Sequence, residues 1–282
     1  MNYKLIAFDL DGTFLDDYKR VPEDNLTALR RASERGIYIV PASGRLYPYL
    51  PEEVRTLPGA RYFITANGNG VYDAVEDRLL YTAAIELSDA LRLADCLEGY
   101  GIPYDFYTDN KAYAQRDFWG LGDTYFTTPA MNRMFHTYIA KVRVPVDCLR
   151  SFIEEQTTPV QKMQLYFPDT DLSGKRKMLE LLPPLFPQLV FSSSLPTNIE
   201  VNSAAATKGQ ALAVLCRELS IAPEETVVFG DGTNDMDMIA LCPNSVAMIN
   251  GDISVRAAAR YISTVDNNSA GVARMLEQLG IV

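Results

Sequence analysis

Two aspartates separated by one residue follow the first apolar run of the chain. The run Leu5-Ile6-Ala7-Phe8 leads directly into Asp9-Leu10-Asp11, and Gly12-Thr13 comes next. A buried strand avoids charge at its end unless the charge is needed there, because an unpaired carboxylate is costly to bury. Gly12-Thr13 permits a turn, which lets Asp9 bind a cation by its side chain and Asp11 by its backbone carbonyl. The Asp11 side chain is then free for proton transfer.

Two other segments place acidic or small polar residues where an apolar run ends. Asp231 follows TVVFG (226–230) and precedes Asn234 and Asp235, and Ser43-Gly44 follows another apolar run. In an open parallel sheet, ligands bind outside the carboxyl ends of the strands. These residues therefore face one common crevice if the order of the strands brings them together.

A group of close carboxylates requires a cation, because the charges otherwise repel one another. Oxygen ligands without histidine or cysteine suit Mg²⁺, so we expect Asp9, Asp11 and Asp231 to hold it. Each motif alone has an ordinary alternative. The segment 9–13 could be a plain turn or the start of a calcium-binding loop, which Phe14 disfavours, and the segment 230–235 could be a glycine turn beside a helix.

The composition argues against several functional classes. A net charge of -10 disfavours nucleic acid and anionic membranes as partners. His136 is the only histidine, so Ser-His-Asp catalysis or a multi-histidine zinc site would depend on one residue that we expect to pack or to make a peripheral contact. The four cysteines form no CxxC pair, and we expect reduced thiols; they are Cys96, Cys148, Cys216 and Cys242.

We expect a cytoplasmic protein, because no basic-then-apolar leader precedes the first strand and no run of about 18 apolar residues could span a bilayer.

Apolar runs alternate with amphipathic segments in the first and last parts of the chain. This alternation predicts a parallel sheet covered by helices on both faces, which is an α/β fold with a Rossmann-like core. The expected strands are 3–9, 37–43, 62–68, 226–232, 245–249 and 260–263, and the expected helices are 22–36, 208–219, 234–242 and 270–279.

The middle of the chain has a different pattern. Between about 83 and 188 it shows short β-like segments rich in tyrosine and phenylalanine, with helical stretches near 87–100 and 173–182. We therefore predict an inserted α+β domain at 83–187 and a core formed by 1–82 and 188–282.

Four segments stand in a characteristic order along the chain: FDLDGTFLD (8–16), PASGR (41–45), TKGQAL (207–212) and GDGTNDMDM (230–238). In order and spacing they resemble the motifs of the haloacid-dehalogenase-like superfamily, and more narrowly its Cof-type phosphatases. The segments ITANG (64–68) and SVAMIN (245–250) also fit, and the resemblance covers essentially the whole chain.

The resemblance implies a role for each of the acidic residues. Asp9 is the expected nucleophile, which becomes an aspartyl phosphate, and Asp11 protonates the leaving alcohol and then takes a proton from the attacking water. Mg²⁺ held by Asp9, Asp11 and Asp231 neutralises the phosphate. Asp235 is expected to orient Lys208 or a metal-bound water rather than to bind the metal directly.

The resemblance also implies a phosphate-binding set and a cap. Arg45 is expected to reach the phosphate or the substrate body, or to form a surface salt bridge. The inserted domain is expected to act as a mobile cap that determines substrate specificity. Ile249-Asn250-Gly251 departs from the usual pattern, and we assign no role to Asn250. The expected phosphate ligands are Leu10, Ser43, Gly44, Lys208 and Asn234.

The expected function is that of a Mg²⁺-dependent phosphatase acting on small phosphorylated metabolites such as sugar phosphates, as a monomer or weak homo-oligomer. A phosphomutase of the same superfamily and a non-catalytic phospholigand-binding module are the alternatives. A dinucleotide-binding oxidoreductase is disfavoured, because Asp9-Leu10-Asp11-Gly12-Thr13 stands where its G-x-G-x-x-G turn would lie.

Overall fold

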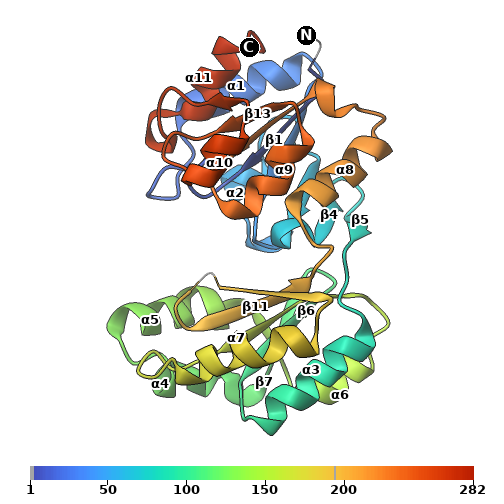
Figure 1. Ribbon diagram of the computed structural model, residues 1–282, viewed down its shortest axis with the longest axis vertical. Coiled ribbons are helices and arrows are strands. Elements are labelled where there is room, and N and C mark those ends of the chain that lie inside the picture. Colours follow the sequence, from blue (N-terminus) through green and yellow to red (C-terminus); the bar gives the residue numbers. More distant parts are fainter. Residues whose placement is uncertain (1–2, 194) are drawn as a thin grey trace. The chain divides into compact units, whose positions relative to one another are not determined.

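The computed structural model describes residues 3–193 and 195–282, and the chain divides into two compact units. The first unit comprises Met1–Thr82 and Ala205–Val282, and the second comprises Ala83–Ala204. Each unit is built on its own sheet (Figure 1). No helix of the described ranges is both long enough and apolar enough to cross a membrane.

The first unit contains a mostly parallel eight-stranded sheet, which confirms the predicted α/β class. The strand order is β14-β13-β12-β1-β2-β3-β4-β5, and all neighbours are parallel except the β3–β4 and β4–β5 pairs, which are antiparallel. The strands are β1 (Leu5–Asp9), β2 (Tyr38–Ala42), β3 (Tyr62–Thr65), β4 (Gly70–Asp73), β5 (Arg78–Thr82), β12 (Thr226–Gly230), β13 (Asn244–Ala247) and β14 (Tyr261–Ile262).

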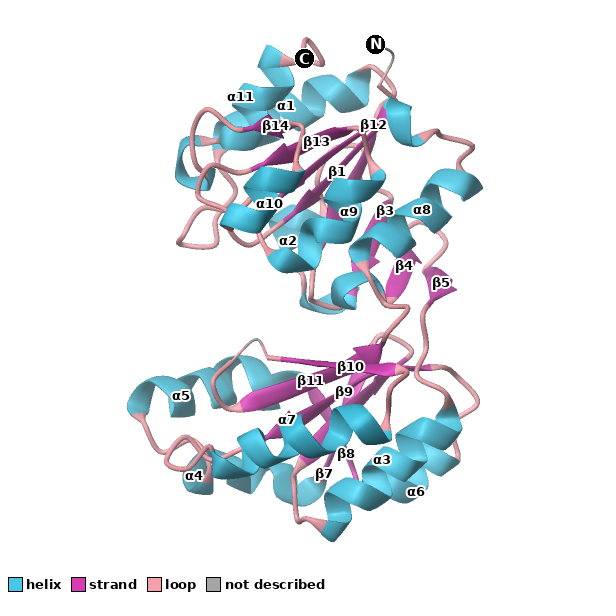
Figure 2. Ribbon diagram, viewed as in Figure 1, coloured by secondary structure: helices cyan, strands magenta, loops and turns pink. Residues whose placement is uncertain are grey.

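Helices cover both faces of this sheet, as Figure 2 shows. Alternate residues of β1 enter different cores: Ile6 and Phe8 pack on one face, and Leu5 and Ala7 pack on the other. This double burial explains why the strand reads as a continuous apolar run. Helices α1 (Glu23–Glu34), α2 (Glu52–Arg55) and α11 (Gly271–Gln278) cover the first face, and α8 (Lys208–Glu218), α9 (Met236–Leu241) and α10 (Ile253–Ala258) cover the second.

The second unit contains a six-stranded sheet in the order β10-β11-β9-β6-β7-β8, antiparallel except between β7 and β8. One face packs against α3, α6 and α7, and part of the other is covered by the helical segment 116–142. The elements are α3 (Leu87–Gly99), β6 (Tyr104–Thr108), β7 (Lys111–Gln115), α4 (Leu121–Thr124), α5 (Pro129–Met134), β8 (Arg143–Val146), α6 (Leu149–Glu154), β9 (Val160–Tyr166), α7 (Ser173–Leu185), β10 (Leu189–Ser192) and β11 (Asn198–Ser203).

The chain returns to the first unit later than the predicted 187/188 boundary. Strands β10 and β11 belong to the second unit because β11 pairs with β9, from Asn198 opposite Tyr166 to Val201 opposite Met163. Ile199 and Val201 are fully buried in that unit's core. A short strand carries no local signal of the sheet that it joins, so the pairing could not be read from its residues.

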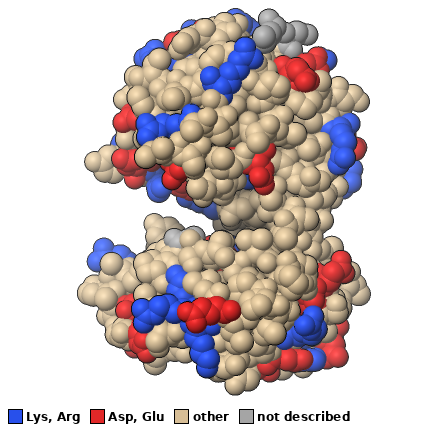
Figure 3. Space-filling model, in the orientation of Figure 1, with Lys and Arg blue, Asp and Glu red and all other residues tan. Residues whose placement is uncertain are grey.

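Acidic and basic side chains are interspersed on the face of each unit that Figure 3 shows. His136 lies in the second unit, exposed, with its ring edge-on to Phe135 at 5.2 Å. All four cysteines are free thiols.

Candidate active site

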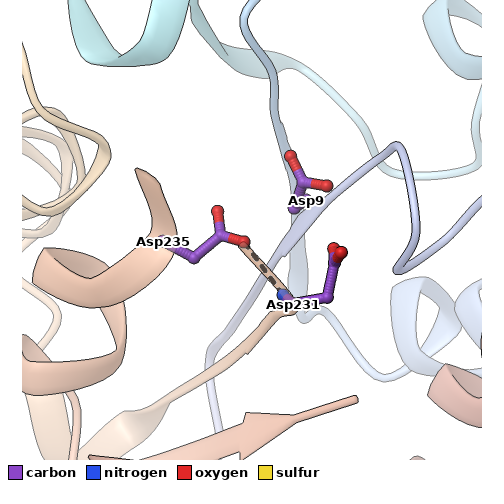
Figure 4. A group of neighbouring side chains, drawn as sticks. All are labelled: Asp9, Asp231 and Asp235. Carbon is purple, nitrogen blue, oxygen red and sulfur yellow. Dashed lines mark hydrogen bonds between the residues drawn. The ribbon is translucent and has the colours of Figure 1, made fainter. Parts of the chain in front are cut away.

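The carboxyl ends of β1 and β12 bring three aspartates together. The two strands are parallel neighbours with Phe8 opposite Phe229, so Asp9 and Asp231 both leave the sheet at the same edge. One carboxylate oxygen each from Asp9, Asp231 and Asp235 lies within 4.8 Å of the others (Figure 4). The cluster therefore joins residues from opposite ends of the sequence.

Lys208 is the cation of this cluster. It is the first residue of α8, its side chain is completely buried, and its ammonium donates to the Asp9 carboxylate and to Asp235 Oδ1 at 2.6 Å. Burial alone would lower the pKa of Lys208, but the two carboxylates outweigh that effect and raise it. Lys208 is therefore a permanent positive charge at neutral pH.

The acidic groups of the cluster outnumber the cation, and the pKa values of two of them, Asp9 and Asp231, are raised. Burial raises the pKa of Asp9 to about 7, opposed by Lys208 and assisted by Asp235. Burial also raises the pKa of Asp231, although a hydrogen bond from Thr13 Oγ1 at 2.6 Å acts in the opposite direction. A divalent cation would relieve this excess of negative charge.

The donor set fits a hard divalent cation such as Mg²⁺, because the close ligands are all oxygens. Of the three aspartates, Asp235 is the least available to bind a metal ion. Its Oδ1 accepts from Lys208, and its Oδ2 accepts from the backbone N–H groups of Asp231 at 2.9 Å and Gly232 at 3.0 Å. Asp9 and Asp231 are therefore the side chains best able to hold the ion, and Asp235 orients Lys208 and the loop after β12.

The side chain of Asp11 lies apart from this cluster and is held by two cations. Arg45 Nη2 donates to both of its carboxylate oxygens at 2.9 Å, and Lys19 Nζ lies 2.8 Å from Oδ1. The Asp11 side chain is 39% exposed, so this carboxylate is accessible to a ligand. The contact of Lys19 was not predicted, because nothing in the spacing of 16–20 shows that the turn brings this lysine back to Asp11.

Gly12 allows the turn after β1 to lie against Asp231. Its φ is +91°, and a Cβ at this position would come within 2.4 Å of Asp231 Oδ2. Leu10 is fully buried, and its carbonyl accepts the backbone N–H groups of Phe14 at 3.0 Å and Leu15 at 2.8 Å. The turn is therefore compact.

The end of β2 adds the hydroxyl and amide groups predicted to bind phosphate. Ser43 is buried, and its Oγ accepts the backbone N–H of Arg45 at 3.2 Å. A Cβ on Gly44 would lie 3.1 Å from the Asn67 side-chain amide, and Asn67 Oδ1 in turn accepts from Asn234 Nδ2 at 3.2 Å. Asn67 thus connects two predicted phosphate ligands, although we assigned it no role from the sequence.

Gly68 places the loop after β3 against the start of α8. A Cβ at this position would lie 2.0 Å from the Thr207 carbonyl oxygen, and the φ of Gly68 is +95°. This close packing of the two segments sets the position from which Lys208 reaches Asp9. All the predicted site residues lie in the first unit.

Comparisons with known proteins find similar sequences over nearly the whole chain. A family model described as haloacid dehalogenase-like hydrolase matches residues 6–276. The chain is 29% identical over 280 residues to the 5-amino-6-(5-phospho-D-ribitylamino)uracil phosphatase YcsE of Bacillus subtilis, covering 98% of this chain and 95% of that protein. It is also 29% identical over 290 residues to the phosphatase YwpJ of the same organism, covering 98% and 99%.

A solved structure has the same fold. The crystal structure of a haloacid dehalogenase-like hydrolase from Bacteroides thetaiotaomicron matches with a TM-score of 0.78 and 26% identity, over 98% of this chain and 99% of the other.

Proposed function

The chain belongs to the haloacid dehalogenase-like hydrolases and is a phosphatase, and from this premise we propose that it hydrolyses small phosphorylated metabolites through an aspartyl phosphate on Asp9. The observation that supports the proposal is the contact of a buried Lys208 with Asp9, beside Asp231, at the edge where β1 and β12 end.

In the first step the Asp9 carboxylate attacks the phosphorus atom, and the bond to the ester oxygen breaks. Asp11 gives a proton to that oxygen, so the product leaves as an alcohol. In the second step water attacks the same phosphorus, its proton passes to Asp11, and the bond to Asp9 breaks. Two displacements replace one difficult step, which is the general advantage of a covalent intermediate.

Asp9 must stay ionised to attack, although burial raises its pKa to about 7. Lys208 supports the ionised form, and Asp235 keeps Lys208 in place by accepting from it at 2.6 Å. Asp9, Asp231 and the backbone carbonyl of Asp11 would hold Mg²⁺. The bound ion supplies positive charge that offsets the repulsion between the carboxylate and the phosphoryl oxygens.

Arg45 and Lys19 keep the Asp11 carboxylate at the edge of the site, where it meets the leaving group. Both cations are also candidates to bind substrate oxygens once the carboxylate has taken up a proton. We propose that groups at the carboxyl ends of the strands, together with Lys208, bind the phosphoryl oxygens. These are the Leu10 and Gly44 amides, the Ser43 hydroxyl, the Lys208 ammonium and the Asn234 side chain.

We propose phosphorylated polyols and sugars as the substrate class, because the relative YcsE is named for a substrate with a phosphate on a ribityl chain. We assign the choice among such compounds to the inserted unit. A panel of sugar phosphates, polyol phosphates and nucleotides tests this assignment, and a preference for nucleotides would contradict it.

Trapping the intermediate tests the mechanism. Enzyme quenched in acid during turnover with Mg²⁺ should carry a phosphoryl group on Asp9, identified by peptide mass spectrometry. Asp9→Asn should carry none and should not turn over, whereas the exposed Asp237→Asn in the same motif should behave as wild type. Normal turnover by Asp9→Asn would disprove the covalent mechanism.

A further inference from the structure

Three asparagine side chains bind the turn after β1, each through one backbone carbonyl of that turn. The donors come from α1, from the loop after β13 and from the turn before α11, segments that are far apart in the sequence. All three bonds have ordinary N–H···O lengths. They run from Asn250 to the Gly12 carbonyl (2.8 Å), from Asn25 to the Phe14 carbonyl (3.0 Å) and from Asn267 to the Leu15 carbonyl (2.9 Å).

Two of these asparagines are also linked to each other. The backbone N–H of Asn267 donates to Asn250 Oδ1 at 3.3 Å. The three hydrogen bonds that link Gly12, Asn250, Asn267 and Leu15 therefore form a closed ring with the backbone between Gly12 and Leu15. Asn267 is buried, with 3% of its surface exposed, whereas Asn250 is exposed. The ring therefore spans the turn from a solvent-exposed contact to a buried one.

The third asparagine ties the turn to the helical layer. Asn25 is completely buried, and its Oδ1 accepts the backbone N–H of Ala273 in α11 at 2.9 Å. Its side chain thus bridges Phe14 and Ala273, which makes it a core-packing contact as well as a contact of the turn. Loss of Asn25 would remove stability and turn geometry together, so it is unsuitable as a probe of position alone.

The turn held by this ring carries groups on which the reaction depends. Asp11 lies inside it, and Thr13 donates from it to Asp231 at 2.6 Å. Asp9 is separated from Asp11 by one residue. A displacement of about 1 Å in a reacting group can cost on the order of a hundredfold in rate.

We propose that Asn250 and Asn267 are positioning residues for the phosphatase reaction, which hold the Gly12 and Leu15 carbonyls and so set the direction in which Asp11 points. The inference rests on the roles given to Asp9 and Asp11 under the proposed function. Asn250 suits the task because its amide donates to the turn while its carbonyl accepts from the neighbouring segment. An aspartate at the same place would set a carboxylate against a backbone carbonyl, with no proton between them.

Two substitutions test the proposal. Asn267→Asp keeps the shape of the side chain but removes its donor, and Asn250→Leu removes the hydrogen bonds without adding a charge. The matched control is Asn244→Asp. Asn244 is about as buried as Asn267 and donates to the Glu224 carbonyl at 2.8 Å, but it lies at the start of β13, at the opposite edge of the sheet from the carboxyl ends of the strands. Each variant is assayed for kcat and KM with p-nitrophenyl phosphate and Mg²⁺, and for its melting temperature.

We expect both ring variants to lower kcat by roughly tenfold to a hundredfold, with a smaller change in KM. Asn244→Asp should lower the melting temperature and leave kcat unchanged. The double variant should lose little more than the worse single variant, since both residues act through one ring. If Asn267→Asp does not fold, Asn250→Leu at the exposed position decides the matter.

Two kinds of failure can be told apart. If Asp9→Asn is inactive but Asn250→Leu and every folded Asn267 variant keep the wild-type kcat, the positioning role is wrong and the proposed function stands. If Asp9→Asn turns over normally, the proposed function fails whatever the asparagine variants do. A rise in KM at unchanged kcat would also overturn the inference, because it would show a binding effect alone.

Discussion

The two units each bury a basic side chain beside acid, but they balance the charge differently. In the first unit Lys208 is, among the described residues, the one cation that contacts Asp9 and Asp235, and Asp231 lies beside them. In the second unit one guanidinium meets one carboxylate: Arg143 and Asp105 are 2.7 Å apart, and the Asp105 side chain is completely buried.

The buried pair of the second unit also has neutral hydrogen-bond partners. Arg143 also donates to the Ile139 carbonyl at 2.9 Å, and the Tyr166 hydroxyl donates to Asp105 Oδ2 at 2.7 Å. The first bond joins the helical segment 116–142 to the sheet of the second unit, and the second links β9 to β6 within that sheet. The pair in the second unit is balanced in charge, although Asp105 Oδ1 has no hydrogen-bond partner among the described residues. The acid-rich cluster of the first unit needs a further cation, so charge imbalance separates a binding site from a structural contact.

The largest expected effect is the loss of the metal. Chelation of divalent cations should abolish turnover, Mg²⁺ should restore it, and Ca²⁺ should restore it poorly because its looser coordination misplaces the nucleophile. Mg²⁺ should also raise the melting temperature, since an ion that binds only the folded protein stabilises it.

Asp231→Asn should lose the rise in melting temperature on addition of Mg²⁺, and Asp147→Asn, an exposed residue of the second unit, should keep it. Full activity in the presence of chelator would show that the acid-rich cluster needs no cation.

Removal of the Lys208 ammonium should be the next largest effect. Lys208→Met should lower kcat by about 10²–10³, the loss typical of one preorganised electrostatic contact at a reacting group. The substitution also leaves two buried carboxylates without their partner. Steady-state kinetics with p-nitrophenyl phosphate measure the effect, and Lys4→Met, at a half-buried lysine away from the cluster, is the control. A kcat equal to that of wild type would remove Lys208 from the mechanism.

Breaking the Arg143–Asp105 pair of the second unit should lower stability rather than kcat. Arg143→Met should lower the free energy of unfolding by about 3–5 kcal/mol, because Asp105 is left charged and buried. The double variant Arg143→Met/Asp105→Leu should recover much of that loss, since both charges are gone. Urea unfolding measures both variants. A double variant as unstable as the single one would show that the charges are not what the pair contributes.

The smallest effect concerns the thiols. The Ser151 hydroxyl donates to Cys148 at 3.3 Å and lowers the pKa of this exposed thiol, whereas burial raises the pKa of Cys216 and raises that of Cys242 to about 12. A lower pKa yields thiolate at a lower pH, so Cys148 should react first with iodoacetamide.

The pH at which half of the maximal alkylation rate of Cys148 is reached should rise in Ser151→Ala. If Cys216 or Cys242 of the first unit were labelled first, burial would not protect these thiols as we expect.

Local sequence was sufficient to predict the α/β class, because strand and helix patterns are short-range. The apolar run before Asp9 marks a buried strand, and the glycine after Asp11 marks a turn. The late return to the first unit was not predictable, because the pairing of β11 with β9 depends on a neighbour rather than on the residues of β11.

The sequence by itself determined which residue types stand at the ends of β1, β2 and β12, and so that an oxygen-rich, acidic edge exists. Only the tertiary structure decided which partner each side chain contacts. Lys19 reaches Asp11 through a turn, and Asn250 and Asn267 reach the Gly12 and Leu15 carbonyls from the far end of the chain. The reason is physical: conformation along the backbone depends on near neighbours, whereas a side-chain hydrogen bond depends on distances that exist only after the sheet has formed.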